Sequence, residues 1–287
     1  MKASEITKYT AAAALTVLLG SCSKVEDSAP GAKLISIELK VSMEPATRSL
    51  NTKRSWNPGK DHILVSTYQT NYGDFSFGEY LVIDTEGNTK AIQPAVRKTD
   101  EYFSGPTQTR IYAFYWPAGS RDRKVNLQDQ STPQLLEAAD ILESRFNPDG
   151  IPTEGVTTVS FYHALTRIRL VLDKATINAS EVTEVLIASA TEASIGTRWP
   201  GGGPILTLEY ANPGWISMCR DTDEPNVFEA LVAPWIQGVW HGYRPGGEQI
   251  KVRFRNPESG EISEFSVLFD NATIWASDTT YEYTISR

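Results

Sequence analysis

The stretch Leu34-Ile35-Ser36-Ile37-Glu38-Leu39-Lys40-Val41-Ser42-Met43-Glu44-Pro45-Ala46-Thr47-Arg48-Ser49 decides how this chain folds. Apolar and polar residues alternate along it, and the apolar set is Ile35, Ile37, Leu39, Val41 and Met43. A period of two is typical of a β-strand that buries one face. Pro45 cannot donate to a ladder, so the strand ends there, and Arg48 follows in a polar run. Such a first strand is either held by the fold or cut off behind the basic residue and removed.

Residues 1–21 precede the fold and have the features of a signal peptide, since an apolar run too short to span a bilayer follows Lys2 and Lys8. The run ends in Leu19-Gly20-Ser21-Cys22, which is similar to a bacterial lipoprotein signal. The similarity implies that Cys22 is acylated, for example with palmitate, and becomes the first mature residue. The alternative is an ordinary cysteine after a secretory signal. Residues 22–33 are predicted to be a tether, so the lipid would be the only membrane contact.

Bulk properties exclude several classes of protein. A net charge of −8 over 287 residues, without a basic stripe, makes nucleic acid a poor partner. Of the two cysteines, acylation of Cys22 would leave Cys219 alone, so no intrachain disulfide is expected. Stability must then come from apolar cores.

Downstream, turn signals separate short strands. Residues 79–84 and 89–92 predict a hairpin, and Thr109–Trp116, apolar on both faces, predicts a central strand. Residues 133–142 fit either a short helix after Pro133 or a strand. Residues 147–155 are rich in Pro and Gly and are the predicted domain boundary.

The second half is predicted to open with a strand over 159–173, interrupted by a β-bulge or break between Leu165 and Ile168, where the apolar phase slips. Further strands are predicted at 182–189, 205–210, 227–233, 249–254, 262–269 and 281–285. The pattern predicts an all-β chain of two β-sandwich domains in tandem, over residues 34–154 and 155–287.

At this point the chain resembles the fimbrillins of Bacteroidetes, the Mfa-like and FimA-like pilins. The most specific motifs are the lipoprotein signal at Cys22 and Phe161-Tyr162-His163-Ala164-Leu165-Thr166-Arg167-Ile168. Looser motifs follow in the family's order: Ala46-Thr47-Arg48, residues 56–65, 111–117 and 135–140, Ala230-Leu231-Val232-Ala233-Pro234, and Tyr281-Glu282-Tyr283-Thr284-Ile285.

The resemblance implies two transthyretin-like β-sandwich domains, export as a lipoprotein to the cell outer membrane, and assembly with other fimbrial subunits into an adhesive fimbrium, as a homo- or hetero-polymer. A trypsin-like protease cuts after an Arg in the first domain of such proteins, and Arg48 fits that position. Loss of the first strand, residues 34–48, then opens a groove that a neighbour's strand fills by donor-strand exchange. Adhesion adds a host or bacterial surface receptor as a candidate partner. In one departure from the family, this chain ends on its own last strand instead of a donor segment, which leaves a tip or accessory role open.

Catalytic, metal and cofactor chemistry find no support in the sequence, so we expect a protein that is not an enzyme. His163 is predicted to be a core histidine, Cys219 a small core residue, and Asp221-Thr222-Asp223-Glu224 a solvated loop. The runner-up function is a monomeric surface lipoprotein that keeps its first strand and binds glycan, with Trp199, Trp215, Trp235 and Trp240 as the stacking candidates. Processing at Arg48 separates the two functions.

Overall fold

A computed structural model describes residues 33–43, 56–69, 74–99, 109–116, 123–144, 156–198, 205–234, 249–268 and 275–287. The signal, the tether, Cys22 and Arg48 lie outside these ranges. The described chain is made of strands with one short helix, which confirms the predicted all-β class. Within these ranges, none of the helical structure is long and apolar enough to cross a membrane.

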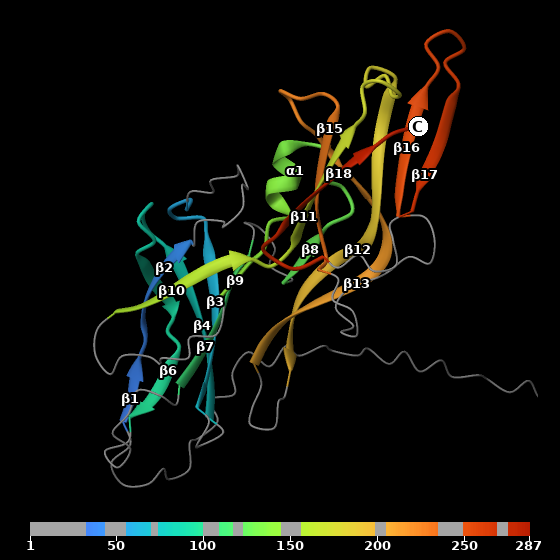
Figure 1. Cartoon of the computed structure of the whole chain (residues 1–287). Helices are drawn as coiled ribbons and strands as arrows, with labels where there is room; N and C mark the ends of the chain where they lie inside the picture. The colour runs from blue at the N-terminus through green and yellow to red at the C-terminus, as the bar shows by residue number, and fades with distance from the viewer. Residues whose placement is uncertain are drawn as a thin grey trace, which may run out of the picture.

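The first half is a seven-stranded sheet whose two ends meet (Figure 1). The strands, in sheet order, are β2 (Glu38–Met43), β10 (Val156–His163), β9 (Leu142–Ser144), β7 (Thr109–Trp116), β3 (His62–Gln69), β4 (Asp74–Val82) and β5 (Thr89–Gln93). A bridge between Lys40 and Asn88 brings β2, at one end, against the start of β5, at the other. Next to this closure, β1 (Lys33–Ser36) pairs antiparallel with β6 (Val96–Thr99). The first half is therefore a sheet that curls until its two ends meet.

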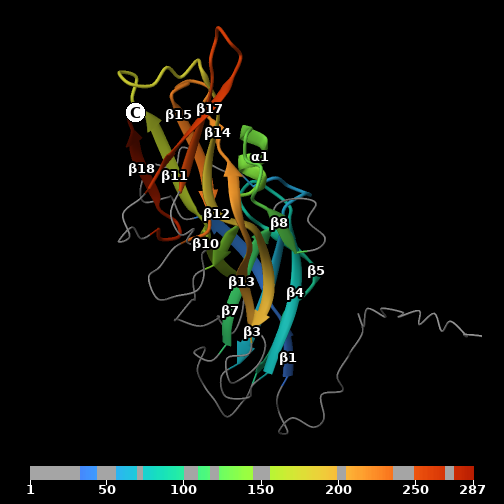
Figure 2. The same ribbon diagram turned by 90° about the vertical axis from the view of Figure 1, so that its right-hand side faces the viewer.

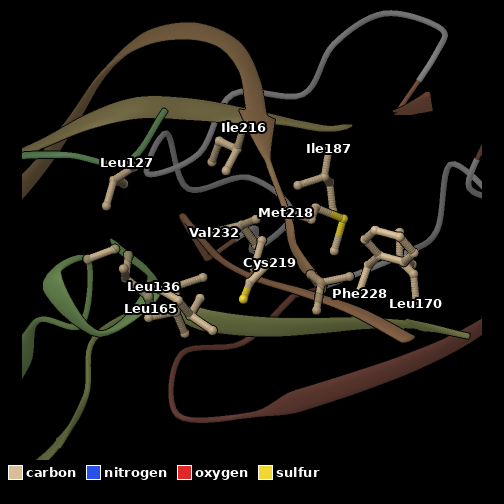
Figure 3. Packing of buried hydrophobic residues seen from close by; sticks show 14 of the residues in the cluster. Leu127, Leu136, Leu165, Leu170, Ile187, Ile216, Met218, Cys219, Phe228 and Val232 are labelled. Atoms are coloured by element: carbon tan, nitrogen blue, oxygen red, sulfur yellow. The ribbon is translucent and has the colours of Figure 1, made fainter. Parts of the chain in front are cut away.

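The second half is a β-sandwich. One sheet contains β14 (Cys219–Arg220), β15 (Val227–Val232), β11 (Thr166–Leu172) and β18 (Thr280–Ile285). The other contains β13 (Ile205–Ser217), β12 (Val182–Arg198), β16 (Ile250–Arg255) and β17 (Ile262–Val267), and β8 (Lys124–Asn126) joins it beside β12. Side chains from both sheets, such as Leu170, Phe228 and Ile187, fill the space between them (Figure 3).

The central strands of the curled sheet bury both faces, as the apolar pattern of residues 109–116 predicts. Ala113 and Tyr115 of β7 point into the core inside the curl, whereas Phe114 and Trp116 belong to the core shared with the second half. The long β12–β13 hairpin reaches this outer face (Figure 2), where the Leu206 backbone N–H donates to Ser66 Oγ at 3.2 Å. The core of the second half thus extends onto the outer face of the curled sheet, whereas the core inside the curl is a separate cluster.

The sheets do not divide at the predicted boundary. β8 and the helix α1 (Pro133–Ala138) precede residues 147–155 yet pack with the second half, since β8 pairs with β12 and Leu136 joins its core. β10 follows the boundary but pairs with β2 and β9 in the first sheet. Both pairings join segments far apart in sequence, and local turn signals carry no information about such partners.

The predicted interruption between Leu165 and Ile168 is the crossing between the halves. The chain bends at Ala164 and Leu165, so that β10 ends at His163 and β11 starts at Thr166. Phe161 is 1% exposed in the core of the curl, and Ile168 is 0% exposed in the core of the sandwich. A change of sheet therefore explains the slip in phase.

Candidate functional site

The first strand lies in a slot that the rest of the chain builds around it. We call the first-strand slot the groove that holds residues 37–42, lined by β10, by the turn before β5 (residues 84–88) and by Ala95. On one side β2 pairs in parallel with β10, from Glu38 opposite Val156 to Met43 opposite Phe161. The two strands are also joined by the hydroxyls of Ser42 and Ser160, 3.1 Å apart. The first strand is thus held through its backbone along its whole length.

A tyrosine anchors the start of β2 on the opposite side. The Ile37 backbone N–H donates to the Ala95 carbonyl at 2.9 Å, and the Tyr80 hydroxyl donates to the Ile37 carbonyl at 2.9 Å. The same hydroxyl accepts from the Ala95 N–H at 2.9 Å. Burial raises the pKa of Tyr80, against the lowering effect of the Ala95 hydrogen bond, so the phenol keeps its proton and remains a donor.

A glycine turn anchors the other end. The Val41 N–H donates to the Gly87 carbonyl at 2.9 Å, and the Thr89 hydroxyl donates to the Leu39 carbonyl. Gly87 has φ +82°, and a Cβ there would lie 1.8 Å from the Val41 carbonyl oxygen. Only glycine allows this approach of the two backbones.

Asp84 holds the glycine turn in shape. Its carboxylate accepts the Asn88 side-chain amide at 2.6 Å and the backbone N–H groups of Asn88 and Glu86 at 3.0 Å. The Asn88 side-chain hydrogen bond, followed by the backbone hydrogen bond of Asn88, lowers the pKa of Asp84. These hydrogen bonds within the turn hold its shape.

The side chains of the first strand complete the core of the curl. Ile37, Leu39 and Val41 are 4%, 4% and 0% exposed, which confirms the predicted buried face for these three residues. Their cluster includes the aromatic residues Trp56, Tyr80, Tyr115 and Phe161. The side chains of Ile35 and Met43 lie outside the described part of the chain. At about 1.5–3 kcal/mol per buried aliphatic side chain, the three contribute roughly 4.5–9 kcal/mol, an upper estimate.

The predicted cleavage residue follows the slot closely in sequence. Met43 ends β2, and the next described residue is Trp56, whose ring meets those of Tyr115 and Phe161 edge-on at 5.8 and 5.9 Å. Arg48 belongs to the connection between these points, which is not described. A cut there would separate the first strand from the residues that line its slot.

A buried ion pair lies where the chain crosses between the halves. His163 Nδ1 is 2.8 Å from Asp140 Oδ1, with side chains 12% and 8% exposed. Beside it the Ala164 N–H donates to the Ile141 carbonyl at 2.9 Å, and the Asp278 N–H donates to the Leu165 carbonyl at 3.2 Å. Burial alone would lower the pKa of His163, but the hydrogen bond and charge of Asp140, with the charge of Asp278, outweigh burial and the nearby Arg167 and raise it above 6.5. His163 is thus a satisfied core histidine, as predicted.

We expect this pair to make stability depend on pH. Because the folded pKa of His163 exceeds the unfolded value, its contribution is complete below about pH 6.5 and disappears as pH rises through the folded pKa. Urea unfolding of the wild type and of His163→Gln should therefore differ most near pH 6 and least near pH 8.5. Asp140→Asn should abolish the same rise toward low pH. A constant difference between wild type and His163→Gln at all pH values would contradict this.

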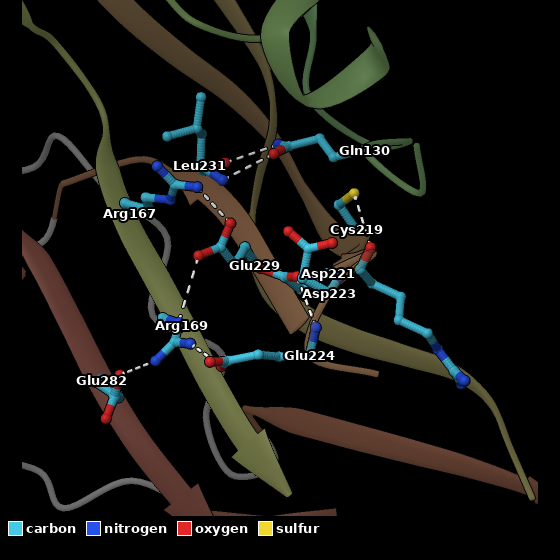
Figure 4. Close-up of polar contacts among 11 residues, drawn as sticks. Gln130, Arg167, Arg169, Cys219, Asp221, Asp223, Glu224, Glu229, Leu231 and Glu282 are labelled. Carbon is cyan, nitrogen blue, oxygen red and sulfur yellow. Dashed lines mark hydrogen bonds and ion pairs between the residues drawn. The ribbon is translucent and has the colours of Figure 1, made fainter. Parts of the chain in front are cut away.

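The acidic loop after β14 is occupied by its own contacts (Figure 4). Asp221 Oδ1 accepts the backbone N–H groups of Asp223 at 2.8 Å and Glu224 at 2.9 Å, and Glu224 pairs with Arg169. The two backbone hydrogen bonds lower the pKa of Asp221. No cluster of metal-ligating side chains occurs among the residues that the structure describes. The loop matches the predicted solvated loop.

The remaining candidates of the sequence are core or surface residues. Cys219 is 5% exposed, and burial raises the pKa of its thiol. The Lys251 ammonium lies over the Trp215 ring, 4.7 Å from the ring centroid. This face of the ring is therefore already covered. Trp199, Trp235 and Trp240 lie outside the described ranges.

The sequence did not reveal the anchors of the slot. Tyr80 and Ala95 lie within or after an ordinary hairpin pattern, and Gly87 was visible only as a turn residue. From a glycine in a hairpin turn, a positive φ can be predicted. The close approach of Val41 to Gly87 cannot, because it arises from pairing between segments that are far apart in the sequence.

No family model matches this chain, and no curated protein matches it either. Solved structures do. A protein assigned provisionally to cell adhesion, from Bacteroides uniformis, has 16% identity and a TM-score of 0.49, over 88% of this chain and 93% of that one. A fimbrial assembly protein from Parabacteroides distasonis has 12% identity and a TM-score of 0.44, over 89% and 93%. The tip fimbrial protein Mfa3 from Porphyromonas gingivalis, with a C-terminal truncation, has 9% identity and a TM-score of 0.41, over 85% and 83%. Each of these three matches covers at least 85% of this chain.

Proposed function

We propose that this chain is a subunit of adhesive cell-surface fimbriae that exchanges its first strand for a strand of another subunit. The observation that carries the proposal is the first-strand slot. Ile37, Leu39 and Val41 fill a core whose other members, and whose hydrogen-bonding anchors, all come from residues after the predicted cut at Arg48. The residues that form the slot therefore all stay in the protein after a cut at Arg48.

The energetics favour replacement over an empty slot. The three aliphatic side chains contribute roughly 4.5–9 kcal/mol, which is of the order of a domain's whole net stability of about 5–15 kcal/mol. An empty slot would expose the edge of β10 and the apolar core beneath it. A strand from another subunit covers both by β-augmentation. The resulting bond is non-covalent yet slow to break, as a fibre requires.

The two ends of the molecule suit assembly in a line. β1 lies at one end, and the C-terminus lies at the other end beside β18 (Figures 1 and 2). A contact between unlike surfaces at opposite ends generates an open filament. The last strand is engaged in its own sandwich, because β18 pairs in parallel with β11.

Export and maturation complete the proposal on sequence grounds. Acylation of Cys22 would hold the precursor at the outer membrane, and a trypsin-like protease would release the first strand by cutting after Arg48. The assembled fimbrium would then present the chain to a host or bacterial surface receptor. The partners are other fimbrial subunits, in a homo- or hetero-polymer.

Protease treatment of the purified chain from Ser23 onward tests the proposal. We expect a cut after Arg48, followed by concentration-dependent oligomers that survive dilution, either alone or when other fimbrial subunits are added. Arg48→Ala should block oligomer formation, provided that the protease does not cut after Lys53 or Arg54 instead. The double variant Lys53→Ala, Arg54→Ala keeps Arg48 and is the control that should still assemble. A cleaved protein that stays monomeric with and without other subunits would favour the monomeric glycan-binding lipoprotein.

A further inference from the structure

The anchors of the first-strand slot fix the position of whatever strand occupies it. Ala95 offers a carbonyl and Tyr80 a hydroxyl to the N–H and C=O of one residue, now Ile37. Gly87 offers a carbonyl to the N–H four residues later, now Val41. These groups belong to the body of the protein, so they would meet the same two positions of any incoming strand. A slip by one residue would turn its apolar face to solvent.

The slot also restricts which side chains fit. Its three buried positions hold Ile37, Leu39 and Val41, packed among aromatic rings with almost no exposure. Cores this close-packed tolerate aliphatic exchange but resist larger side chains. The residues between them are less constrained, since Glu38 is exposed and Lys40 and Ser42 are half-buried.

Gly87 lets the backbone of the bound strand lie very close to the turn. The missing side chain lets the third buried residue bring its carbonyl within reach of the turn. Proline at the first or third buried position would lose the hydrogen bond to Ala95 or Gly87, because it has no N–H. The pairing with β10 requires the strand to run parallel to β10.

We propose that the slot accepts a proline-free strand of another protein that runs parallel to β10 and places aliphatic residues at three alternate positions, with Tyr80 and Gly87 setting its register. This proposal rests on the strand exchange argued above and adds the sequence rule of the partner.

The last strand of a second copy does not satisfy the rule. The alternating residues of β18 are Tyr281, Tyr283 and Ile285, so two phenol rings would stand where Ile37 and Leu39 now fit. Both hydroxyls are engaged in their own half, where the Tyr283 hydroxyl accepts from Trp275 Nε1 at 3.0 Å and the Tyr281 hydroxyl from the Ala276 N–H at 3.1 Å. The last strand of a second copy is therefore excluded as the occupant, which favours a strand from a chain of different sequence.

Peptide competition tests the rule on the chain from Ser23 after cleavage at Arg48. The probe is a fluorescent peptide of residues 33–44, added in excess until anisotropy is constant. Three unlabelled competitors follow: the same sequence, the same sequence with Tyr in place of Ile37 and Leu39, and the sequence in reverse order. We expect the first to displace the probe and the other two to compete at least about tenfold less well.

Two glycine variants test the register. Gly87→Ala should weaken probe binding at least about tenfold, because the new methyl group meets the carbonyl of the bound strand. Gly59→Ala is the matched control, since Gly59 also has positive φ (+74°) but has no atom within 4 Å of the added carbon. Equal binding in the wild type and both variants would remove Gly87 from the proposal.

The outcomes separate the two proposals. If the cleaved protein takes up no peptide, not even its own sequence, strand exchange itself fails. If it takes up its own sequence, the Tyr-containing sequence and the reversed sequence equally well, exchange stands and the sequence rule is wrong. If an uncut second copy supplies the strand better than any peptide, the occupant is a swapped first strand of this same chain and the assignment to a different protein is overturned.

Discussion

Truncation of Phe161 to Ala should lower the free energy of unfolding by about 3–5 kcal/mol. Phe161 is 1% exposed, lies edge-on to Trp56 at 5.9 Å and stands opposite Met43 across the β2–β10 pair. Its removal leaves a cavity at the junction between the slot and the core of the curl, where neighbouring strands prevent collapse. Urea denaturation followed by tryptophan fluorescence measures the loss.

The matched control for Phe161 is Val156→Ala on the same strand. Val156 is 52% exposed, so its truncation should change stability by no more than about 0.5 kcal/mol. Ile168→Ala, 0% exposed in the other core, should cost about 2–5 kcal/mol. A loss below about 1 kcal/mol for Phe161 or Ile168 would mean that the crossing at Ala164 and Leu165 does not place both residues inside.

The crossing between the halves also shows what local sequence patterns can and cannot predict. The sequence of residues 159–173 predicts two strand segments with a β-bulge or a break between them, because period-two alternation and its slip are local properties. It could not predict that the segments enter different sheets. That outcome depends on β10 pairing with β2, whose residues precede it by more than a hundred positions, and on β11 pairing with β15 and β18.

Glycine and proline signals misled the prediction for the β12–β13 hairpin. The sequence predicts strands over 182–189 and 205–210, yet the structure extends them to Arg198 and Ser217. Asn212 adopts φ +55°, and the pairing skips Thr191 and Asn212 before it continues. In the sequence alone, such a local irregularity cannot be told from the end of a strand, although the pairing of the two strands continues beyond it.

The slot could be predicted only in part for the same reason. The alternation of apolar and polar residues identified Ile37, Leu39 and Val41 as a buried face, because a half-buried strand shows this pattern in its own sequence. No local sequence pattern identifies the groups that hold the strand, above all the Tyr80 hydroxyl and the Gly87 turn. Their role depends on the segment that packs against them in three dimensions.

Leu39→Asp should strongly destabilise the first strand. Leu39 is 4% exposed among apolar side chains, so the substitution loses about 2–5 kcal/mol of burial and adds an unpaired carboxylate at roughly 1–3 kcal/mol or more. The sum, roughly 3–8 kcal/mol, is of the same order as the roughly 4.5–9 kcal/mol with which the three aliphatic side chains hold the strand. Lys40→Asp, at the neighbouring half-buried position, is the control and should stay within about 1 kcal/mol of the wild type.

The unfolding behaviour of Leu39→Asp shows whether the first strand can leave its slot while the rest of the protein stays folded. If the slot is an independent binding site, the uncut variant should release residues 33–43 while the sandwich, with its core of Leu170, Phe228 and Ile187, stays folded. The open slot would then take up the peptide of residues 33–44 without any cut. A single cooperative unfolding transition that carries both halves, with no gain in peptide binding, would contradict strand exchange, because the first strand would then be an integral part of one core. The shared outer face of β7, where Phe114 and Trp116 join the core of the sandwich, works in favour of the separable outcome, since it supports the curled sheet from the side that β2 does not touch.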